Sequence, residues 1–94
     1  MNDNYEVKFQ CINLRDALIR NLNDNFITVS FEIIDGGDVQ TKFTLSAITE
    51  KEMEYIEDIM AEFSLRQFKN TVLPPKIVLN SYSALENVVF SKSG

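Results

Sequence analysis

Apolar and polar residues alternate along two neighbouring stretches in the first half of the chain, residues 26–34 and 39–46. A period of two is typical of half-buried strands. Between them stands the turn sequence D-G-G-D at positions 35–38, where glycines adopt positive φ at little cost. The pattern predicts a β-hairpin. A shorter alternation over residues 5–11 predicts an additional strand at the start of the chain.

Apolar residues in the stretch 14–22 follow helical rather than strand spacing, at Leu14, Ala17, Leu18 and Leu22. Asn13 precedes them and is a candidate N-cap, because an Asn side chain accepts hydrogen bonds from the amides of a first helical turn. A short helix is therefore expected over residues 14–22.

A second helix is expected to begin at Glu50. The Thr49 hydroxyl can cap its first turn, and Glu52 stands three residues later, where a capping-box carboxylate reaches back to the cap. Its end is expected between Ser64 and Asn70. At helical spacing, one stripe of this helix is apolar and is expected to be buried; it consists of Met53, Ile56, Ile59, Met60 and Phe63.

The C-terminal part of the chain predicts two short strands, residues 76–80 and 87–91, joined by a link over 81–86 and followed by a frayed tail, 91–94. Pro74 and Pro75 fix an extended connection before the first of them. The expected fold is a single α+β domain spanning residues 1–94. It is expected to be an antiparallel sheet of four or five strands with two helices on one face, in the ferredoxin-like (split βαβ) order.

The composition limits both the compartment and the chemistry. The 94 residues, 45% of them hydrophobic, are enough for one core without metals or disulfides. Cys11 is the only cysteine, and we expect it to be a small buried hydrophobe in a protein of the reducing cytoplasm. The N-terminus does not resemble a signal peptide, and no stretch is apolar enough to span a membrane.

Formal charge is concentrated in residues 50–62. This segment holds six acids and one base, and so carries a net charge equal to the whole formal charge of −5, while the other eight acids and eight bases cancel. An acidic protein with a pI near 4.6 is not expected to bind nucleic acid directly. The acids expected outside the buried arc of the second helix are Glu50, Glu54, Glu57, Asp58 and Glu62.

This acidic face has two interpretations. It is either a solvated helix surface or a docking surface for a basic partner, because a surface of one sign raises the encounter rate and rejects wrong partners. Mixed signs are usual on a merely soluble face, whereas here only Lys51 accompanies the acids. Tyr55, at the border of the acidic and apolar arcs, is a candidate anchor, and Asp35 and Asp38 in the hairpin turn are candidate further contacts.

Candidate catalytic chemistry is weak, and we expect neither an enzyme nor a cofactor or metal site. The chain has no histidine, the usual general base. Glu54 and Asp58 form a carboxylate pair, but on a convex helix face rather than in the concave setting that such a site needs. Asp35 and Asp38 resemble a fragment of a calcium loop without its remaining oxygen ligands, so a turn is the expected role.

A small, acidic, histidine-free α+β chain with the segment T-E-K-E-M-E-Y-I-E-D-I-M-A-E resembles the immunity proteins of bacterial toxin systems, including those of contact-dependent growth inhibition. The resemblance is one of size, charge and this segment. It implies a cytoplasmic, non-enzymatic inhibitor with one cognate basic partner, a toxin nuclease domain. In such a complex the carboxylates would cover the surface that otherwise holds nucleic-acid phosphates.

Two alternatives remain open. One is a phage-encoded acidic decoy that inhibits a host defence nuclease. The other is a structural or assembly subunit that associates with itself through an exposed strand edge, at residues 5–11 or 88–90.

Overall fold

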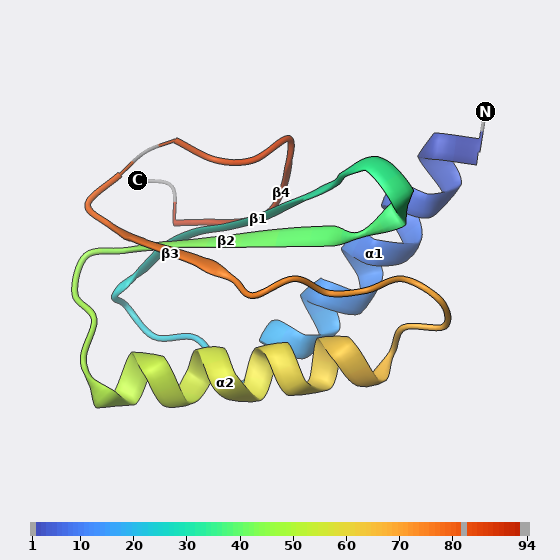
Figure 1. Cartoon of the computed structure of the whole chain (residues 1–94). Coiled ribbons are helices and arrows are strands. Elements are labelled where there is room, and N and C mark those ends of the chain that lie inside the picture. Colours follow the sequence, from blue (N-terminus) through green and yellow to red (C-terminus); the bar gives the residue numbers. More distant parts are fainter. Residues whose placement is uncertain (1, 82, 93–94) are drawn as a thin grey trace.

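The computed structural model describes residues 2–81 and 83–92. It is an α+β structure of two helices and a four-stranded mixed sheet (Figure 1). The elements are α1 (Asn2–Leu18), β1 (Phe26–Ile33), β2 (Val39–Leu45), α2 (Glu50–Leu65), β3 (Lys76–Leu79) and β4 (Asn87–Ser91), with a 3₁₀ turn at Asp35–Gly37.

The β1–β2 hairpin is confirmed as predicted. The strands pair antiparallel with Val29 opposite Phe43 and Ile33 opposite Val39. Gly36 and Gly37, in the turn between them, have φ of 86° and 88°. Side chains with a Cβ are disfavoured in this region, so the two glycines explain why the chain reverses here.

The start of the chain differs from the prediction, because one helix replaces the expected strand over 5–11 and helix over 14–22. Val7, Cys11, Leu14 and Leu18 recur at helical spacing, and all four lie in or against the core. Tyr5, which a strand would place on the same face as Val7, is exposed. Asn13 lies inside the helix rather than at its N-cap.

The sheet is mixed rather than antiparallel, in the order β3-β2-β1-β4. β3 runs parallel to β2, with Phe43 opposite Ile77, while β4 runs antiparallel to β1. A parallel pair needs a long crossover, and α2 supplies it by carrying the chain back before β3 begins. The ferredoxin-like order begins with a strand, so it is not the observed order.

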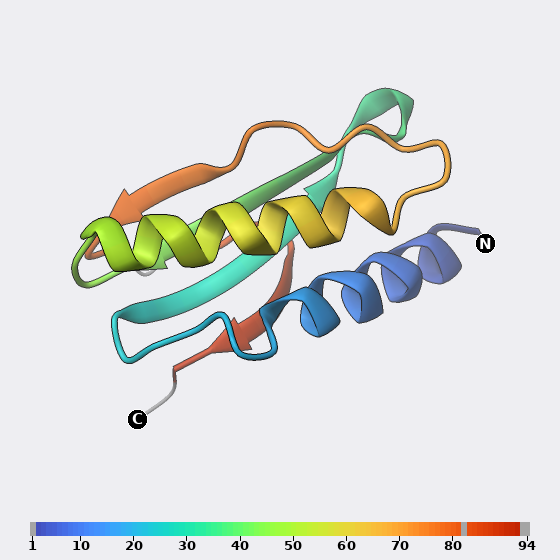
Figure 2. The same cartoon turned by 90° about the horizontal axis from the view of Figure 1, so that it is seen from below.

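A single cluster of buried apolar side chains joins the sheet to both helices, and α1 contributes Leu14, Ala17 and Leu18 to it. Phe43 and Phe31 enter it from the strands, and Ile56, Ile59 and Phe63 enter it from α2. Three of the five residues in the predicted stripe of α2 are thus buried, whereas Met53 is exposed and Met60 is half-buried. Seen from below, α2 crosses in front of the strands and α1 lies beside it (Figure 2).

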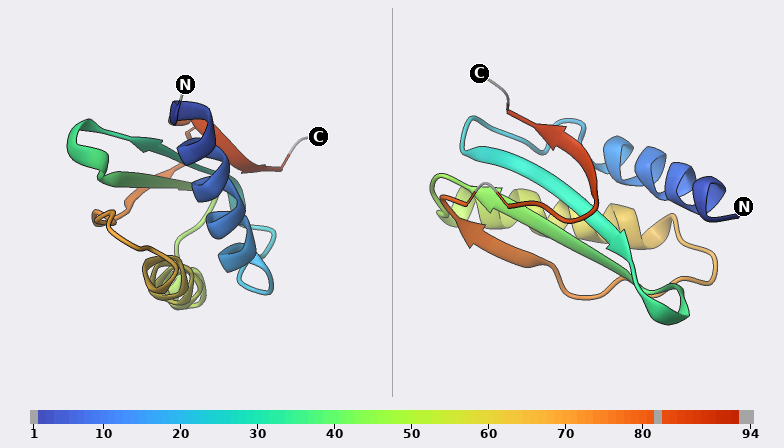
Figure 3. Two further views of the ribbon diagram at one scale, coloured as in Figure 1. Left: turned by 90° about the vertical axis from the view of Figure 1, so that its right-hand side faces the viewer. Right: turned by 90° about the horizontal axis from the view of Figure 1, so that it is seen from above.

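The link between β3 and β4 joins opposite edges of the sheet, so it must cross the sheet. It passes over the face that does not carry α2 (Figure 3). Two polar contacts hold it there: the Leu85 amide donates to Ser30 Oγ at 2.9 Å, and Lys42 Nζ donates to Ser83 Oγ at 2.7 Å. Of the expected frayed tail, Ser91 ends β4, and its last two residues, 93 and 94, lie outside the described part.

Candidate functional site

The helix α2 begins where the sequence predicts, and Glu52 anchors its start. Its carboxylate accepts hydrogen bonds from the hydroxyl and the amide of Thr49, which completes the predicted capping box. The second carboxylate oxygen accepts from Asn23 Nδ2 at 2.7 Å and Asn25 Nδ2 at 2.8 Å. Glu52 therefore ties α2 to the loop before β1, a partnership across 27 residues or more that spacing alone does not reveal.

Glu52 is an internal acid rather than a member of the acidic face, since only 2% of it is exposed. The bond from the Thr49 hydroxyl, followed by those from Asn25 and Asn23, holds the pKa of Glu52 well below its usual range. The carboxylate is thus ionised and fully engaged inside the protein. The charge available to a partner comes from the other acids of α2.

Four acids of α2 are exposed and have no ion pair within the described residues: Glu50, Glu54, Glu57 and Asp58. Lys51, the base on this helix, lies over the Tyr55 ring with its Nζ 5.3 Å from the ring centroid. These four carboxylates therefore form a surface of one sign. We call them the acidic face.

Glu62 differs from those four because it is already paired. It accepts from Arg66 Nη2 at 2.9 Å, and the same guanidinium reaches Asp16 of α1 at 3.4 Å. The Arg66 bridge links the end of α2 to α1 and neutralises part of the charge. Glu62 therefore contributes less to the acidic face than its helical position predicts.

Tyr55 and the two aspartates of the hairpin turn do not join the acidic face in the expected way. Tyr55 is half-buried and packs against Phe26, with ring centroids 6.4 Å apart, so most of it belongs to the core. Asp35 is exposed and Asp38 is half-buried. Their turn lies at the end of the sheet opposite the start of α2 (Figure 1), so the structure does not bring them together with Glu50 and Glu54.

Large apolar side chains at the other end of α2 escaped the sequence reasoning. Leu65, the last residue of α2, is exposed. Phe68 is exposed too, and its ring stacks on Phe9 of α1 at a centroid distance of 5.9 Å. The sequence did not predict this contact, because residues 5–11 were expected to form a strand, whereas Phe9 lies in α1 beside the end of α2.

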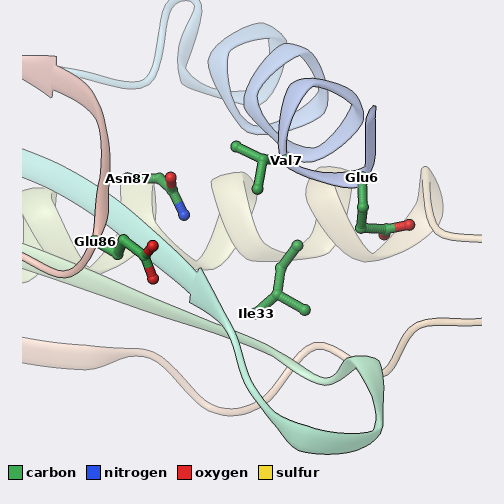
Figure 4. A pocket seen from close by; sticks show the side chains of 5 residues that line it. All are labelled: Glu6, Val7, Ile33, Glu86 and Asn87. Carbon is green, nitrogen blue, oxygen red and sulfur yellow. The ribbon is translucent and has the colours of Figure 1, made fainter. Parts of the chain in front are cut away.

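A separate hollow of about 260 Å³ lies between α1, the end of β1 and the start of β4 (Figure 4). Val7 and Ile33 form its apolar part, and Glu6, Glu86 and Asn87 its polar part. Asn87 Nδ2 donates a hydrogen bond to the Phe31 carbonyl oxygen at 3.2 Å. The polar groups that face a ligand are then mainly acceptors, the Asn87 side-chain oxygen and the carboxylates of Glu6 and Glu86. The lining suits a cation better than an anion, but none of these residues lies on the acidic face.

Comparisons with known proteins do not assign a function to the candidate site. Within residues 2–81 and 83–92, no three His, Cys, Asp or Glu side chains gather closely enough to hold a metal ion. Neither α1 nor α2 is long and apolar enough to cross a bilayer. No protein-family model matches the chain, and no curated protein is similar to it.

Proposed function

We propose that this chain is an immunity protein, which binds a cognate basic toxin in the cytoplasm and neutralises it through the acidic face of α2. The toxin's nuclease domain is the proposed partner. Its lysines and arginines, arranged to hold nucleic-acid phosphates, would pair with the carboxylates instead. The chain itself would perform no catalysis and need no cofactor.

One observation carries this proposal: Glu50, Glu54, Glu57 and Asp58 are exposed together without a basic neighbour that pairs with them in the described chain. Like charges at i, i+4 on a helix destabilise it by about 0.2–0.5 kcal/mol per pair. Glu54 and Asp58 therefore do not stabilise the fold through each other. A binding role would explain this arrangement of carboxylates, because such a surface steers a cationic partner into contact.

The proposal also uses the expectation that both helices cover one face of the sheet. In that arrangement the sheet holds α2 rigidly through Ile56, Ile59 and Phe63, and the acidic face points outward. A rigid, preorganised row of carboxylates loses little side-chain and backbone freedom on binding, which favours affinity.

An immunity gene is expected to lie beside the gene of its toxin, so the proposal predicts a basic nuclease domain encoded there, and protection against that domain is the test. Glu57→Lys with Asp58→Lys reverses two charges of the acidic face, and both residues are exposed, so folding should be little changed. We expect the double variant to protect less well, so that at least about tenfold more of it is needed for the same inhibition of the nuclease.

A matched control carries the same change of net charge elsewhere. Asp24→Lys with Glu86→Lys alters two exposed acids that are not on α2 and should protect as well as the natural chain. If both double variants protect equally, the acidic face is not the docking surface. If both fail equally while remaining folded, net charge rather than this face determines the activity.

A further inference from the structure

The two flanks of α2 differ, because one faces α1 and the other faces β3. Figure 2 shows α1 on one side of α2 and β3 on the other. Toward α1, Glu62 is already paired with Arg66, and the same guanidinium reaches Asp16. Lys51 and Tyr55, whose side chains contact each other, fall within about 20° of Glu62 around the helix. The one base of α2 therefore lies on the α1 flank, and the β3 flank has none.

On the β3 flank, two methionines border the acidic face. Met53 and Met60 are seven residues apart, so they lie almost in line along the helix. Thr41 Oγ1 of β2 donates to Met60 Sδ at 3.5 Å, which places this line on the side of β2 and β3. Met53, nearer the start of the helix, is 38% exposed. Glu57 stands four residues after Met53 and three before Met60, so it is the member of the acidic face that lies closest to the methionines.

The outer strand β3 presents apolar side chains on the same side of the sheet. Ile77 pairs with Phe43, and Leu79 pairs with Leu45. Phe43 and Leu45 belong to the core that the sheet shares with the helices. Paired residues of parallel strands point to the same face, so Ile77 and Leu79 point to the side of α2. Leu79 is 51% exposed there, and Figures 1 and 2 both show this end of β3 beside the start of α2.

The opposite face of this sheet edge is basic. Lys76 and Val78 alternate with Ile77 and Leu79 along β3, so they point away from α2. Lys76 pairs with Lys42 of β2, and the two bases therefore stand side by side on that face. A molecule that lies along the edge of β3 thus meets carboxylates on one side and ammonium groups on the other. This asymmetry favours a segment whose own charge alternates from one face to the other.

The main chain of β3 has hydrogen-bonding groups that the sheet does not use. The Asn80 amide donates to the Leu45 carbonyl at 2.7 Å, which fixes the alternation of main-chain groups along the strand. By that alternation, the amides and carbonyls of Ile77 and Leu79 point away from β2, and they bond to no other segment of the described chain. The other outer strand, β4, is bulged against β1, and a bulge interrupts the regular spacing that an added strand needs. The edge of β3 is therefore the better template for a further strand.

We propose that an extended segment of the basic partner adds to β3 as a fifth strand, with lysine or arginine at alternate positions. Its main chain bonds to Ile77 and Leu79. Its basic residues point to α2, where their aliphatic stems cover Leu79 and Met53 and their charged ends reach Glu57. The residues between them are apolar, because they stand beside Lys76. The inference rests on the proposed function for the source of this segment, and it adds how the segment is recognised.

A synthetic peptide of alternating lysine and valine, Lys-Val-Lys-Val-Lys-Val-Lys, tests the proposal without any toxin. In a nuclear magnetic resonance titration of the purified chain, we expect this peptide to shift the amide signals of Ile77 and Leu79 and the methyl signal of Met53. The control peptide, Lys-Lys-Lys-Lys-Val-Val-Val, has the same residues and charge but no alternation. It should bind at least about fivefold more weakly, and its shifts should be confined to the acidic face.

Leu79→Pro removes an outward amide and no bond to β2, and an edge strand accepts proline where the N–H faces solvent. We expect it to weaken binding of the alternating peptide at least about fivefold. Ser91→Pro is the matched change on β4, because the Lys92 amide bonds to the Ile27 carbonyl and the Ser91 amide therefore points away from β1. This variant should bind the peptide as the natural chain does. Circular dichroism checks the fold of both variants, and if Leu79→Pro does not fold, the comparison of the two peptides decides.

Three results would overturn strand addition at β3. They are equal binding of the two peptides, no shift at Ile77 and Leu79 with up to about 1 mM of the alternating peptide, and equal binding by the natural chain and a folded Leu79→Pro variant. Shifts confined to α2 would also overturn it but would leave the attraction by the acidic face standing. Failure of the proposed function is a separate result, in which the natural chain binds the alternating peptide at β3 but does not protect against the nuclease.

Discussion

Glu52 shows how one side chain can have a different role from its neighbours of the same type. Four acids of α2 point to solvent and have no basic partner among the described residues, but Glu52 accepts hydrogen bonds from Thr49, Asn23 and Asn25 inside the protein. The sequence predicts half of this role, because the capping box follows from Thr49 and Glu52 alone. The two asparagines could not be predicted, since only the folded chain brings their loop beside the helix.

The stability of the protein should depend on pH through Glu52. Its pKa is lowered in the folded state, so it stabilises the fold above the ordinary glutamate pKa of about 4.3, and this contribution is lost as the pH falls below that value. We expect Glu52→Gln to lower the free energy of unfolding at pH 7 and to flatten its decline toward pH 3. Urea unfolding at several pH values measures both effects.

Glu54→Gln is the matched control for that experiment, because it removes the same charge two residues away at an exposed position. Its stability should stay within about 0.5 kcal/mol of the natural chain. A Glu52→Gln variant with the natural pH profile would show that the buried carboxylate does not govern the acid stability.

The first element is where the sequence prediction was wrong, and the reason lies in two coincident patterns. Tyr5, Val7, Phe9 and Cys11 alternate as in a strand, but Val7, Cys11, Leu14 and Leu18 have helical spacing over a longer stretch. Buried Gln10 interrupts the helical apolar pattern, and exposed Ile12 and Ile19 add apolar residues off the core side. The predicted helix over 14–22 therefore starts and ends later in the chain than the observed helix, Asn2–Leu18.

Gln10 is buried because α1 and the end of α2 share a pair of amide hydrogen bonds. Gln10 Nε2 donates to Gln67 Oε1 at 2.8 Å, and Gln67 Nε2 donates back at 2.9 Å. We expect Gln67→Ala to reduce the free energy of unfolding by about 1–3 kcal/mol, since it leaves a buried amide without its main partner. Replacing both residues by Leu should cost less than the two single Leu variants added together. Additive losses in urea unfolding would show that the two amides act independently.

The second half of the fold was predicted more closely in its elements than in their arrangement. β3, β4, α2 and the hairpin all occur near their expected positions. The parallel pairing of β3 with β2 was missed, because strand direction is set by where α2 delivers the chain and not by the residues of β3. Val39 already contacts the approach to β3 through bonds to Thr71 and Leu73, which fixes the parallel course before the strand begins.

Over the whole molecule, charge and apolar surface are separated along the pair of helices. The N-terminal part of α2 carries the acidic face, while Leu65 and Phe68 are exposed at and just beyond the end of this helix. The sequence predicted the acidic face through its count of charges. It did not predict the stacking of exposed Phe68 on Phe9, because Phe9 was expected in a strand. The acidic face is therefore the surface that we propose for a basic partner.

We propose that the exposed carboxylates of the acidic face draw a basic protein into contact with α2. The association rate constant with the proposed cognate nuclease domain, measured over a range of ionic strengths, tests this attraction. We expect the rate to fall steeply with salt for the natural chain, and to be slower and much less dependent on salt for Glu57→Lys with Asp58→Lys. Equal rates and equal salt dependence for the two proteins would show that the acidic face does not attract this partner.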